Sequence, residues 1–398
     1  MVHRSPLWMN RQRTFGSLKG AIDADVLIIG GGITGVSAAY HLSGSGKNVV
    51  LVEKNLIAGG SSGCGTGLLS PGLDMDFSEL VERFGSRSAH DVWELTLRSM
   101  KEMIRLIRKY RISCDLEKKG GVIAAFSKDS MPDLMKEKRV REKFGHPCRL
   151  YAGSDVRKVA NVSALAVLYS KEDAEINQEK FVLGVAKRIS GSVRIFEKTR
   201  ALRVKKSGNF YYVVTPGGTI KAKKLILTAS DDSRKFLSIR EKITKSECYE
   251  IATRKLTAKQ RKSIGWKKGG ALWPMGYFDL SGSGGGYDYL RLTADGRLIV
   301  GGEDSKKALR HYEKRVELLK KFVGLVFPRL NGVSVDYEWN GAIYSTEKVL
   351  PDIGSRGSLF YSFDYGGTGL LLGFYSGKIM ANMALGKRDK NLRILRGK

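Results

Sequence analysis

The sequence predicts an α/β fold of two lobes, one built around a parallel sheet and the other around a mixed β-sheet. Three observations support this prediction. An apolar strand pattern near the amino terminus leads through a glycine turn into a helix pattern, and a second glycine turn opens a helix pattern near the carboxyl terminus. Several further strand patterns lie between them. With 398 residues and 42% hydrophobic content, the chain is long enough for two substantial cores.

The first glycine turn lies between a strand and a helix. The run "ADVLII" that precedes it is short, apolar and partly β-branched, as in a buried parallel strand, and "GVSAAYHL" follows with helical spacing. In this position Gly30 makes the tight turn, Gly32 lets the backbone approach a pyrophosphate, and Gly35 lets helix and strand pack closely. The start of the helix then offers unpaired NH groups and a partial positive charge to the phosphates.

A second apolar strand pattern, "NVVLVEK", ends in an acid. Glu53 lies 18 residues after Gly35, a spacing suited to hydrogen bonds from ribose hydroxyls. Strand, turn, helix, strand and acid in this order predict a Rossmann-like dinucleotide site. NAD and FAD both fit this unit.

The residues after the acid favour one of these two cofactors. "LIAGGSSGCGTGLLSPG" is a long loop that offers backbone NH groups and hydroxyls to a second face of the cofactor. Here the sequence resembles the flavin-dependent D-amino-acid oxidase (DAO) superfamily, whose members carry such a loop, and within it the gamma-glutamylputrescine oxidase-like and glycine oxidase-like members. The resemblance covers nearly the whole chain, from "SPLWMN" through "YLRLTADGRLIVGGED" to "FDYGGTGLLLGFYSGKIMANMALG". It implies FAD and a DAO or glutathione-reductase-type flavoprotein fold.

The expected FAD contacts come from the first turn, the acid, the loop and the second turn. In the family, the second turn lies by the pyrimidine end of the flavin, and many relatives have His where this chain has Thr368. Alternatively, the glycines of this turn serve only close packing. The expected cofactor-binding residues are Gly30, Gly32, Ile33, Thr34, Gly35, Glu53, Lys54, Gly60, Ser61, Ser62, Thr66, Gly67, Leu68, Leu69, Gly366, Gly367, Thr368, Gly369 and Leu370.

The attachment of FAD is expected to be non-covalent. Some members of the superfamily link the flavin through a cysteine near the carboxyl-terminal domain boundary, where the nearest match here is Ala342. Others use a histidine in the loop after the acid, where this chain has Cys64. We expect Cys64 to pack near the cofactor without bonding to it, because cysteine is common in tight buried loops. The scattered cysteines and the absence of a CxxC pair give no indication of a metal site.

The resemblance and the strand patterns predict a discontinuous FAD-binding domain of residues 1–88, 150–232 and 340–398, with a substrate-binding domain of residues 89–149 and 233–339. "RALRVKK", "FYYVVT" and "TIKAKKLILTAS" are expected to return the chain to the FAD-binding domain as three strands. A helix is predicted over Trp93–Tyr110, a strand at "GVIAAF", and a hairpin around Asp295-Gly296. "SGSGGG", at 281–286, is expected to be either a lid or a hairpin loop.

Oxidation of an amine by a flavin demands little from side chains, since the ring takes the hydride and the protein orients the reacting C–H bond near flavin N5. Arg291 matches a family segment that often projects a cation or an aromatic ring toward the flavin, and Tyr289 and Tyr344 are candidate cavity walls. Each of the three is as readily explained by packing or a surface ion pair. Tyr344 or a neighbour stands where glycine oxidases carry an arginine for the substrate carboxylate, so a bare α-amino acid is a doubtful substrate.

The chain is strongly basic, with a net charge of +29, and this charge attracts anions. A lysine-rich solvated surface explains it, because no basic helix interleaved with aromatics stands out. The expected function is FAD-dependent oxidation of a primary or secondary amine or an amino-acid-like substrate, with oxygen or another electron acceptor. A flavoprotein that acts on a modified tRNA base remains an alternative. Without a signal peptide or an apolar membrane span in the sequence, we expect a cytoplasmic enzyme.

Overall fold

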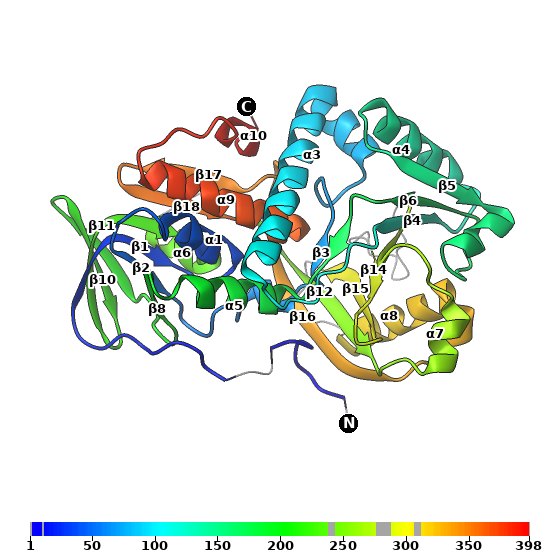
Figure 1. Cartoon of the computed structure of the whole chain (residues 1–398), viewed down its shortest axis with the longest axis horizontal. Coiled ribbons are helices and arrows are strands. Elements are labelled where there is room, and N and C mark those ends of the chain that lie inside the picture. The colour runs from blue at the N-terminus through cyan, green and yellow to red at the C-terminus, as the bar shows by residue number, and fades with distance from the viewer. Residues whose placement is uncertain (1, 10–11, 238–242, 276–287, 306–311, 398) are drawn as a thin grey trace.

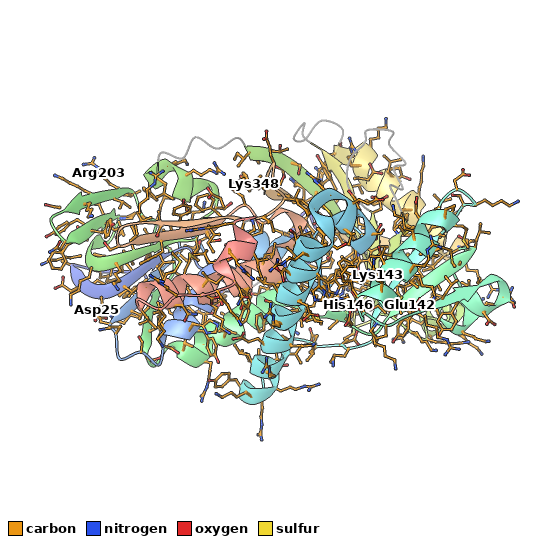
Figure 2. All side chains as sticks on the ribbon, turned by 90° about the horizontal axis from the view of Figure 1, so that it is seen from above. Asp25, Glu142, Lys143, His146, Arg203 and Lys348 are labelled. Carbon is orange, nitrogen blue, oxygen red and sulfur yellow. The ribbon has the colours of Figure 1, made fainter. Side chains whose placement is uncertain are left out.

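The protein is described by a computed structural model covering residues 2–9, 12–237, 243–275, 288–305 and 312–397. It has a mixed α/β fold with two large sheets that lie side by side along the long axis, as predicted (Figure 1). The long helix α3 (Phe77–Tyr110) runs between them. In the view from above, α3 separates the lobe that carries Asp25 and Arg203 from the lobe that carries Glu142, Lys143 and His146 (Figure 2).

The first sheet contains the predicted nucleotide-binding unit. Its central strands are parallel: α1 connects β1 to β2, α5 leads into β8, and β11 is reached through β9 and β10. The register pairs Ile28 of β1 with Leu51 of β2 and with Ile226 of β11. The predicted return of the chain through β9, β10 and β11 is confirmed. In order, the main path is β17 (Asp352–Arg356), β18 (Leu359–Phe363), β11 (Gly218–Leu227), β1 (Ile22–Ile29), β2 (Val49–Val52) and β8 (Val193–Phe196), and β10 (Phe210–Thr215) joins β11 to β9 (Arg203–Ser207).

Three helices pack together beside this sheet, α1 (Ile33–Leu42), α5 (Gln178–Ile189) and α9 (Gly369–Ala384). The approach of α9 to α1 depends on glycine. A Cβ at Gly377 would lie 2.5 Å from the carbonyl oxygen of Thr34 and 2.6 Å from Cβ of Ser37. Gly377, in the body of α9, therefore has a packing role that is separate from the glycine turn before the helix.

Over the described residues, the β13–β4 pair of the second sheet is parallel and the other neighbouring strands are antiparallel. The hairpin predicted around Asp295-Gly296 is confirmed, since β14 pairs with β15 on either side of it. In order, the strands are β16 (Val335–Thr346), β12 (Ile243–Thr253), β15 (Leu298–Ser305), β14 (Tyr289–Leu292), β13 (Ala271–Pro274), β4 (Gly121–Ala125), β6 (Ala166–Ser170) and β5 (Cys148–Ala152).

Smaller elements complete the fold. The helix α8 packs on β12 and β15, and α4 packs on the β4–β6–β5 edge of the second sheet. The remaining elements are α2 (Ser61–Cys64), β3 (Leu68–Leu69), α4 (Met131–Lys143), η1 (Gly153–Lys158), β7 (Ala174–Glu175), α6 (Asp231–Leu237), α7 (Ala258–Ile264), α8 (Tyr312–Val326), η2 (Pro328–Leu330), η3 (Gly366–Thr368) and α10 (Leu392–Leu395).

Two expectations differ from the structure in detail, and a third falls on residues that the structure does not describe. The helix predicted to begin at Trp93 begins at Phe77, with a break at Gly85, where φ is +77°. Sheet membership puts β5, β6 and β16 in the second sheet, whereas the predicted FAD-binding domain includes residues 150–152, 166–170 and 340–346 of these strands. Antiparallel β-strand patterns do not reveal which sheet they join. The segment 281–286 lies outside the described residues.

Candidate functional site

A cavity of about 720 Å³ extends from the end of β1 in the first sheet to the strands of the second sheet. Most of the expected cofactor-binding residues line it, namely Gly30, Gly32, Ile33, Thr34, Glu53, Lys54, Gly60, Ser61, Ser62, Thr66, Gly67, Leu68, Gly366, Gly367, Thr368, Gly369 and Leu370. Gly35 and Leu69 do not line it. The two glycine turns and the loop therefore come together around one space, as the sequence predicted.

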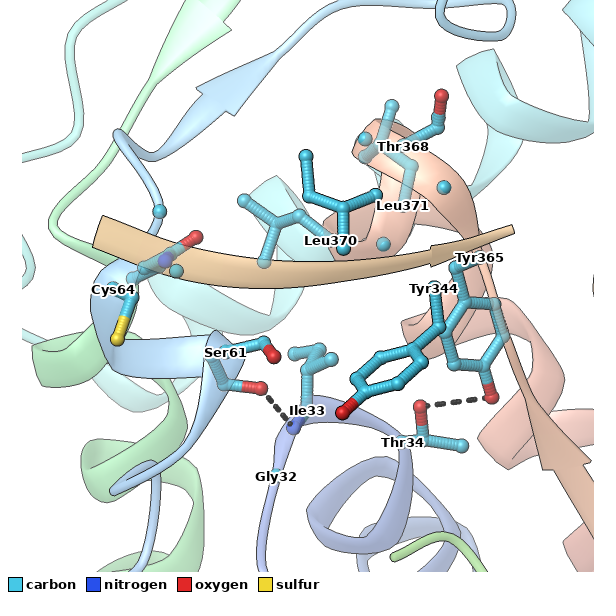
Figure 3. Close-up of a pocket in the computed structure, with 18 of the residues that line it drawn as sticks. Gly32, Ile33, Thr34, Ser61, Cys64, Tyr344, Tyr365, Thr368, Leu370 and Leu371 are labelled. Atoms are coloured by element: carbon cyan, nitrogen blue, oxygen red, sulfur yellow. Dashed lines mark hydrogen bonds between the residues drawn. The ribbon is translucent and has the colours of Figure 1, made fainter. Parts of the chain in front are cut away.

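The first glycine turn is shaped by close backbone contacts. A Cβ at Gly30, whose φ is +114°, would lie 2.8 Å from three atoms of Thr228, and a Cβ at Gly35 would lie 1.8 Å from the carbonyl oxygen of Gly30. Gly35 thus serves the packing of helix on strand, while Gly32 faces the cavity. The first turn of α1 has NH groups without an intrahelical acceptor, and Ser62 Oγ accepts one of them from Ile33 at 2.9 Å (Figure 3).

Glu53 holds the turn in place as well as lining the cavity. Its Oε2 accepts a hydrogen bond from the Gly31 amide at 2.7 Å, and its Oε1 accepts one from Asn55 at 2.8 Å. Burial raises the pKa of this carboxyl, and the two amides oppose that shift. A carboxylate oxygen has room for more than one donor, so the predicted contact with ribose hydroxyls is compatible with these bonds.

Arg291 binds the loop after the acid on the side that faces away from the cavity. This guanidinium is buried, and its Nη1 donates to the carbonyl oxygens of Thr66 at 2.5 Å and Ile176 at 2.9 Å. Its Nε lies 3.7 Å from Glu175, and its other face covers the ring of Trp8. Arg291 does not line the cavity, in contrast to the expectation that it projects toward the flavin, because its donors are directed to the back of the loop.

Cys64 lies in the cavity wall, as expected. Burial raises the pKa of its thiol to about 12, so the thiol stays protonated at neutral pH. The carbonyl oxygen of Cys64 accepts a hydrogen bond from Trp339 Nε1 at 2.8 Å, which ties the loop to β16. Ala342 also lines the cavity, and its carbonyl oxygen accepts a bond from Ser61 Oγ at 3.3 Å.

The two tyrosines named as candidate walls both line the cavity. Tyr344 projects from β16 over the glycine turn, on the side where Thr34 Oγ1 donates to the Tyr365 hydroxyl at 3.1 Å (Figure 3). Tyr289 packs over Gly301, where a Cβ would lie 2.4 Å from the tyrosine oxygen. The second sheet thus supplies an aromatic wall opposite the first glycine turn.

The second glycine turn, before α9, contacts a carboxylate that the sequence reasoning missed. A Cβ at Gly367 would lie 2.3 Å from Asp74 Oδ2, so a larger residue there would require this carboxylate to move. Burial raises the pKa of the Asp74 carboxyl, and the Gly367 amide opposes this shift. The signal in the sequence for a carboxylate at this position is the acidic segment "LDMD", which directly follows the loop.

A group of charged side chains lies at the end of the cavity that α3, α4 and β6 surround. Asp76 precedes α3, Arg141 belongs to α4, and Asp173 follows β6, and all three line the cavity. No single motif unites residues so far apart in sequence, and "KEKRVREK" of α4 resembles an ordinary solvated helix. These residues were therefore not predicted. Among the described residues, no cluster of His, Cys, Asp and Glu is placed to hold a metal ion.

The fold and the cavity are those of a dinucleotide-binding protein, and comparison with known proteins identifies the family. Residues 25–383 match the DAO family, described as FAD dependent oxidoreductase, and this chain belongs to it. Its cofactor is FAD. The glycine cradle and the loop fit that group, because a dinucleotide needs close backbone approach at the turn and donors along the loop.

Two relatives align over nearly the full length. The chain is 28% identical to a Haemophilus influenzae protein named Probable oxidoreductase OrdL, over 98% of this chain and 89% of the relative. It is 26% identical to the gamma-glutamylputrescine oxidoreductase of Escherichia coli, over 96% and 88%. Among solved structures, the glycine oxidase of Geobacillus kaustophilus superposes with a TM-score of 0.78 at 17% identity, over 92% and 96% of the two chains. The last comparison supports the fold.

The chain is therefore an FAD-dependent oxidoreductase. Over the part of the chain that the structure describes, no helix has the length and apolar character to cross a membrane.

Proposed function

We propose that this protein oxidises a primary or secondary amine, or an amino-acid-like substrate, at the carbon next to the nitrogen. The amine loses a hydride from this carbon and a proton from nitrogen, and water hydrolyses the resulting imine. When bound, FAD supplies the hydride acceptor. The continuous cavity carries this proposal, because it joins the dinucleotide cradle to a chamber walled by the second sheet.

The side chains around the chamber suit the two tasks that such a reaction leaves to the protein. Tyr289 and Tyr344 form aromatic walls that exclude water and restrict the orientation of the substrate. Arg291 acts as a positioning residue: it fixes the carbonyl oxygen of Thr66 and so the shape of the loop that holds the cofactor. The relatives named for oxidation of glycine and gamma-glutamylputrescine support an amine as the substrate class.

An anaerobic screen tests the proposal. The purified FAD-loaded protein is mixed with single amines and amino acids, and bleaching of the flavin absorbance is followed. At least one amine should bleach the flavin, with an aldehyde or ketone as product. Modified tRNA forms a second arm of the screen. Bleaching by modified tRNA, with none by any free amine, would refute the proposal and favour the alternative that the charge of +29 suggests. Admission of air, and separately of an electron-accepting dye, then identifies the acceptor class.

A further inference from the structure

The terminal nitrogens of Arg141 are unused donors in the cavity wall. Its Nε donates to Glu137 Oε1 at 2.6 Å, and its guanidinium lies over the ring of Trp93, 4.8 Å from the centroid. Only 9% of the Arg141 side chain is exposed. Among the described residues, its two Nη atoms donate no hydrogen bond, although the residue lines the cavity. A buried guanidinium normally has its donors satisfied, so this one is arranged for a ligand.

Glu137 fixes the guanidinium of Arg141 through Nε and leaves the two Nη atoms available for a ligand. The Glu137 carboxylate is completely buried and accepts hydrogen bonds from the amides of Phe77 and Ser78 at the start of α3. Its partners are thus two helix amides and Arg141 Nε. Trp93 supports the flat face of the guanidinium. The fork of Nη atoms is left at the cavity surface in a fixed orientation.

Two carboxylates face the same region without closing on Arg141. Burial lowers the pKa of Arg141, but the negative charges of Glu137, Asp173 and Asp76 raise it. Among the described residues, the ion pair of Arg141 is with Glu137. Asp173 Oδ1 accepts a hydrogen bond from Ser70 Oγ at 2.6 Å, which orients this carboxylate. Positive and negative groups therefore border one space at a separation greater than an ion pair.

We propose that this end of the cavity binds an α-amino-acid headgroup at the far end of the substrate, with its carboxylate on Arg141 and its ammonium on Asp173 and Asp76. The inference rests on the proposed amine oxidation and deepens it. The substrate is then an elongated amine: the amine that reacts lies at one end, and the zwitterion at the other holds the molecule in register.

The charges favour a zwitterion over a single ion. An anion alone would pair with Arg141 but would meet two carboxylates, and a second ammonium alone would leave the Nη donors of Arg141 buried without a partner. A headgroup with both charges satisfies each side. Burial raises the pKa values of Asp76 and Asp173, and a bound ammonium would favour their ionised forms.

The test compares substrates that differ only in the headgroup. N-γ-glutamyl-1,4-diaminobutane has both charges, its 4-aminobutanoyl analogue lacks the carboxylate, and its glutaryl analogue lacks the ammonium. L-Lysine, cadaverine and 6-aminohexanoate form the same series at a shorter length. In at least one series, the compound with both charges should show a kcat/KM at least about tenfold above each analogue, as the loss of one charge-assisted hydrogen bond predicts.

Variants connect this preference to the residues. Arg141→Lys keeps the charge beside Glu137 but loses the fork, and should raise KM for the two-charge compound about tenfold while changing the 4-aminobutanoyl compound less than about twofold. Asp173→Asn should reduce the preference over the glutaryl analogue. Arg139→Lys, at an exposed arginine on the same helix, is the matched control and should behave as the unmodified protein.

A binding measurement gives a result that does not depend on turnover. N-γ-Glutamyl-butylamide has the headgroup but no terminal amine, and calorimetry of the FAD-loaded protein should give a Kd that Arg141→Lys weakens about tenfold. Equal kcat/KM within each series, or a Kd unaffected by Arg141→Lys, would overturn the headgroup site. If no amine bleaches the flavin but the butylamide binds through Arg141, the proposed function fails and the headgroup site stands.

Discussion

Replacement of Gly32 by valine should give a folded protein that has lost FAD. Gly32 is the amino-terminal cap of α1, and its φ of −77° is available to any residue, so the change does not strain the backbone. A Cβ at this position would lie 3.1 Å from Ser62 Oγ, and valine adds two methyl groups to it. These atoms occupy the surface where the backbone must approach the pyrophosphate.

The magnitude follows from the hydrogen bonds that this approach allows. Two bonds from helix amides to a pyrophosphate, at about 1.5–3 kcal/mol each, contribute roughly 3–6 kcal/mol. Their loss corresponds to an increase of about 10²–10⁴ in the Kd for FAD. The protein should therefore be purified colourless, whereas Gly44→Val, at an exposed turn glycine with nothing within 4 Å of its Cβ, should remain yellow.

The assay has two parts. The ratio of flavin to protein absorbance reports occupancy, and quenching of FAD fluorescence on titration gives the Kd. Thermal melts of the FAD-free proteins then separate loss of binding from loss of fold, and Gly32→Val should melt close to the unmodified chain. Full flavin occupancy in Gly32→Val would refute the assignment of this turn to the pyrophosphate.

Three further outcomes are expected. Acid denaturation should release all FAD from the chain, because burial holds the Cys64 pKa at about 12 and keeps the thiol unreactive; flavin fluorescence that stays with the polypeptide on a denaturing gel and is lost in Cys64→Ala would contradict this. Glu137→Gln should cost ~3–5 kcal/mol in urea unfolding, since it leaves Arg141 buried without its partner. The Arg141 charge lowers the Glu137 pKa against the effect of burial, so the stabilisation is complete above about pH 4.5 and is lost at lower pH, and urea titrations of Glu137→Gln should show a weaker acid dependence. Burial lowers the pKa of His41 to about 4. Between pH 6.5 and pH 4 the unfolded chain therefore binds one more proton than the folded chain, and the free energy of unfolding should decrease by up to ~3 kcal/mol as the pH falls. An equal decrease in His41→Gln would show that another group is the cause.

The glycine turn and the loop that we propose to hold FAD could be predicted because they are encoded by local stretches of the sequence. Three short segments close together in sequence carry this information: the turn at Gly30–Gly35, the acid Glu53 and the loop after it. Their spacing predicts how they are arranged, and the structure brings them around one cavity. The role of Arg291 could not be predicted in the same way. Tyr289 and Arg291 are two positions apart on one strand, and the pattern does not tell which of them reaches the cavity and which supports the loop from behind.

The other half of the cavity is assembled from segments that are distant in sequence. Asp76 comes from the start of α3, Arg141 from α4 and Asp173 from the end of β6, and only the packing of α4 against α3 and the second sheet brings them together. Asp173 contacts the loop through Ser70, whereas among the described residues Arg141 makes no hydrogen bond with the glycine turn or the loop. Substitutions at Arg141 on α4 can therefore change the substrate contacts without removing a hydrogen bond of the proposed FAD cradle. Two relatives of this chain are named for different substrates, glycine in one case and gamma-glutamylputrescine in the other. In such a fold, the motif that identifies the family is the part of the chain least informative about the substrate, and specificity is to be sought on the helices that close the far end of the cavity.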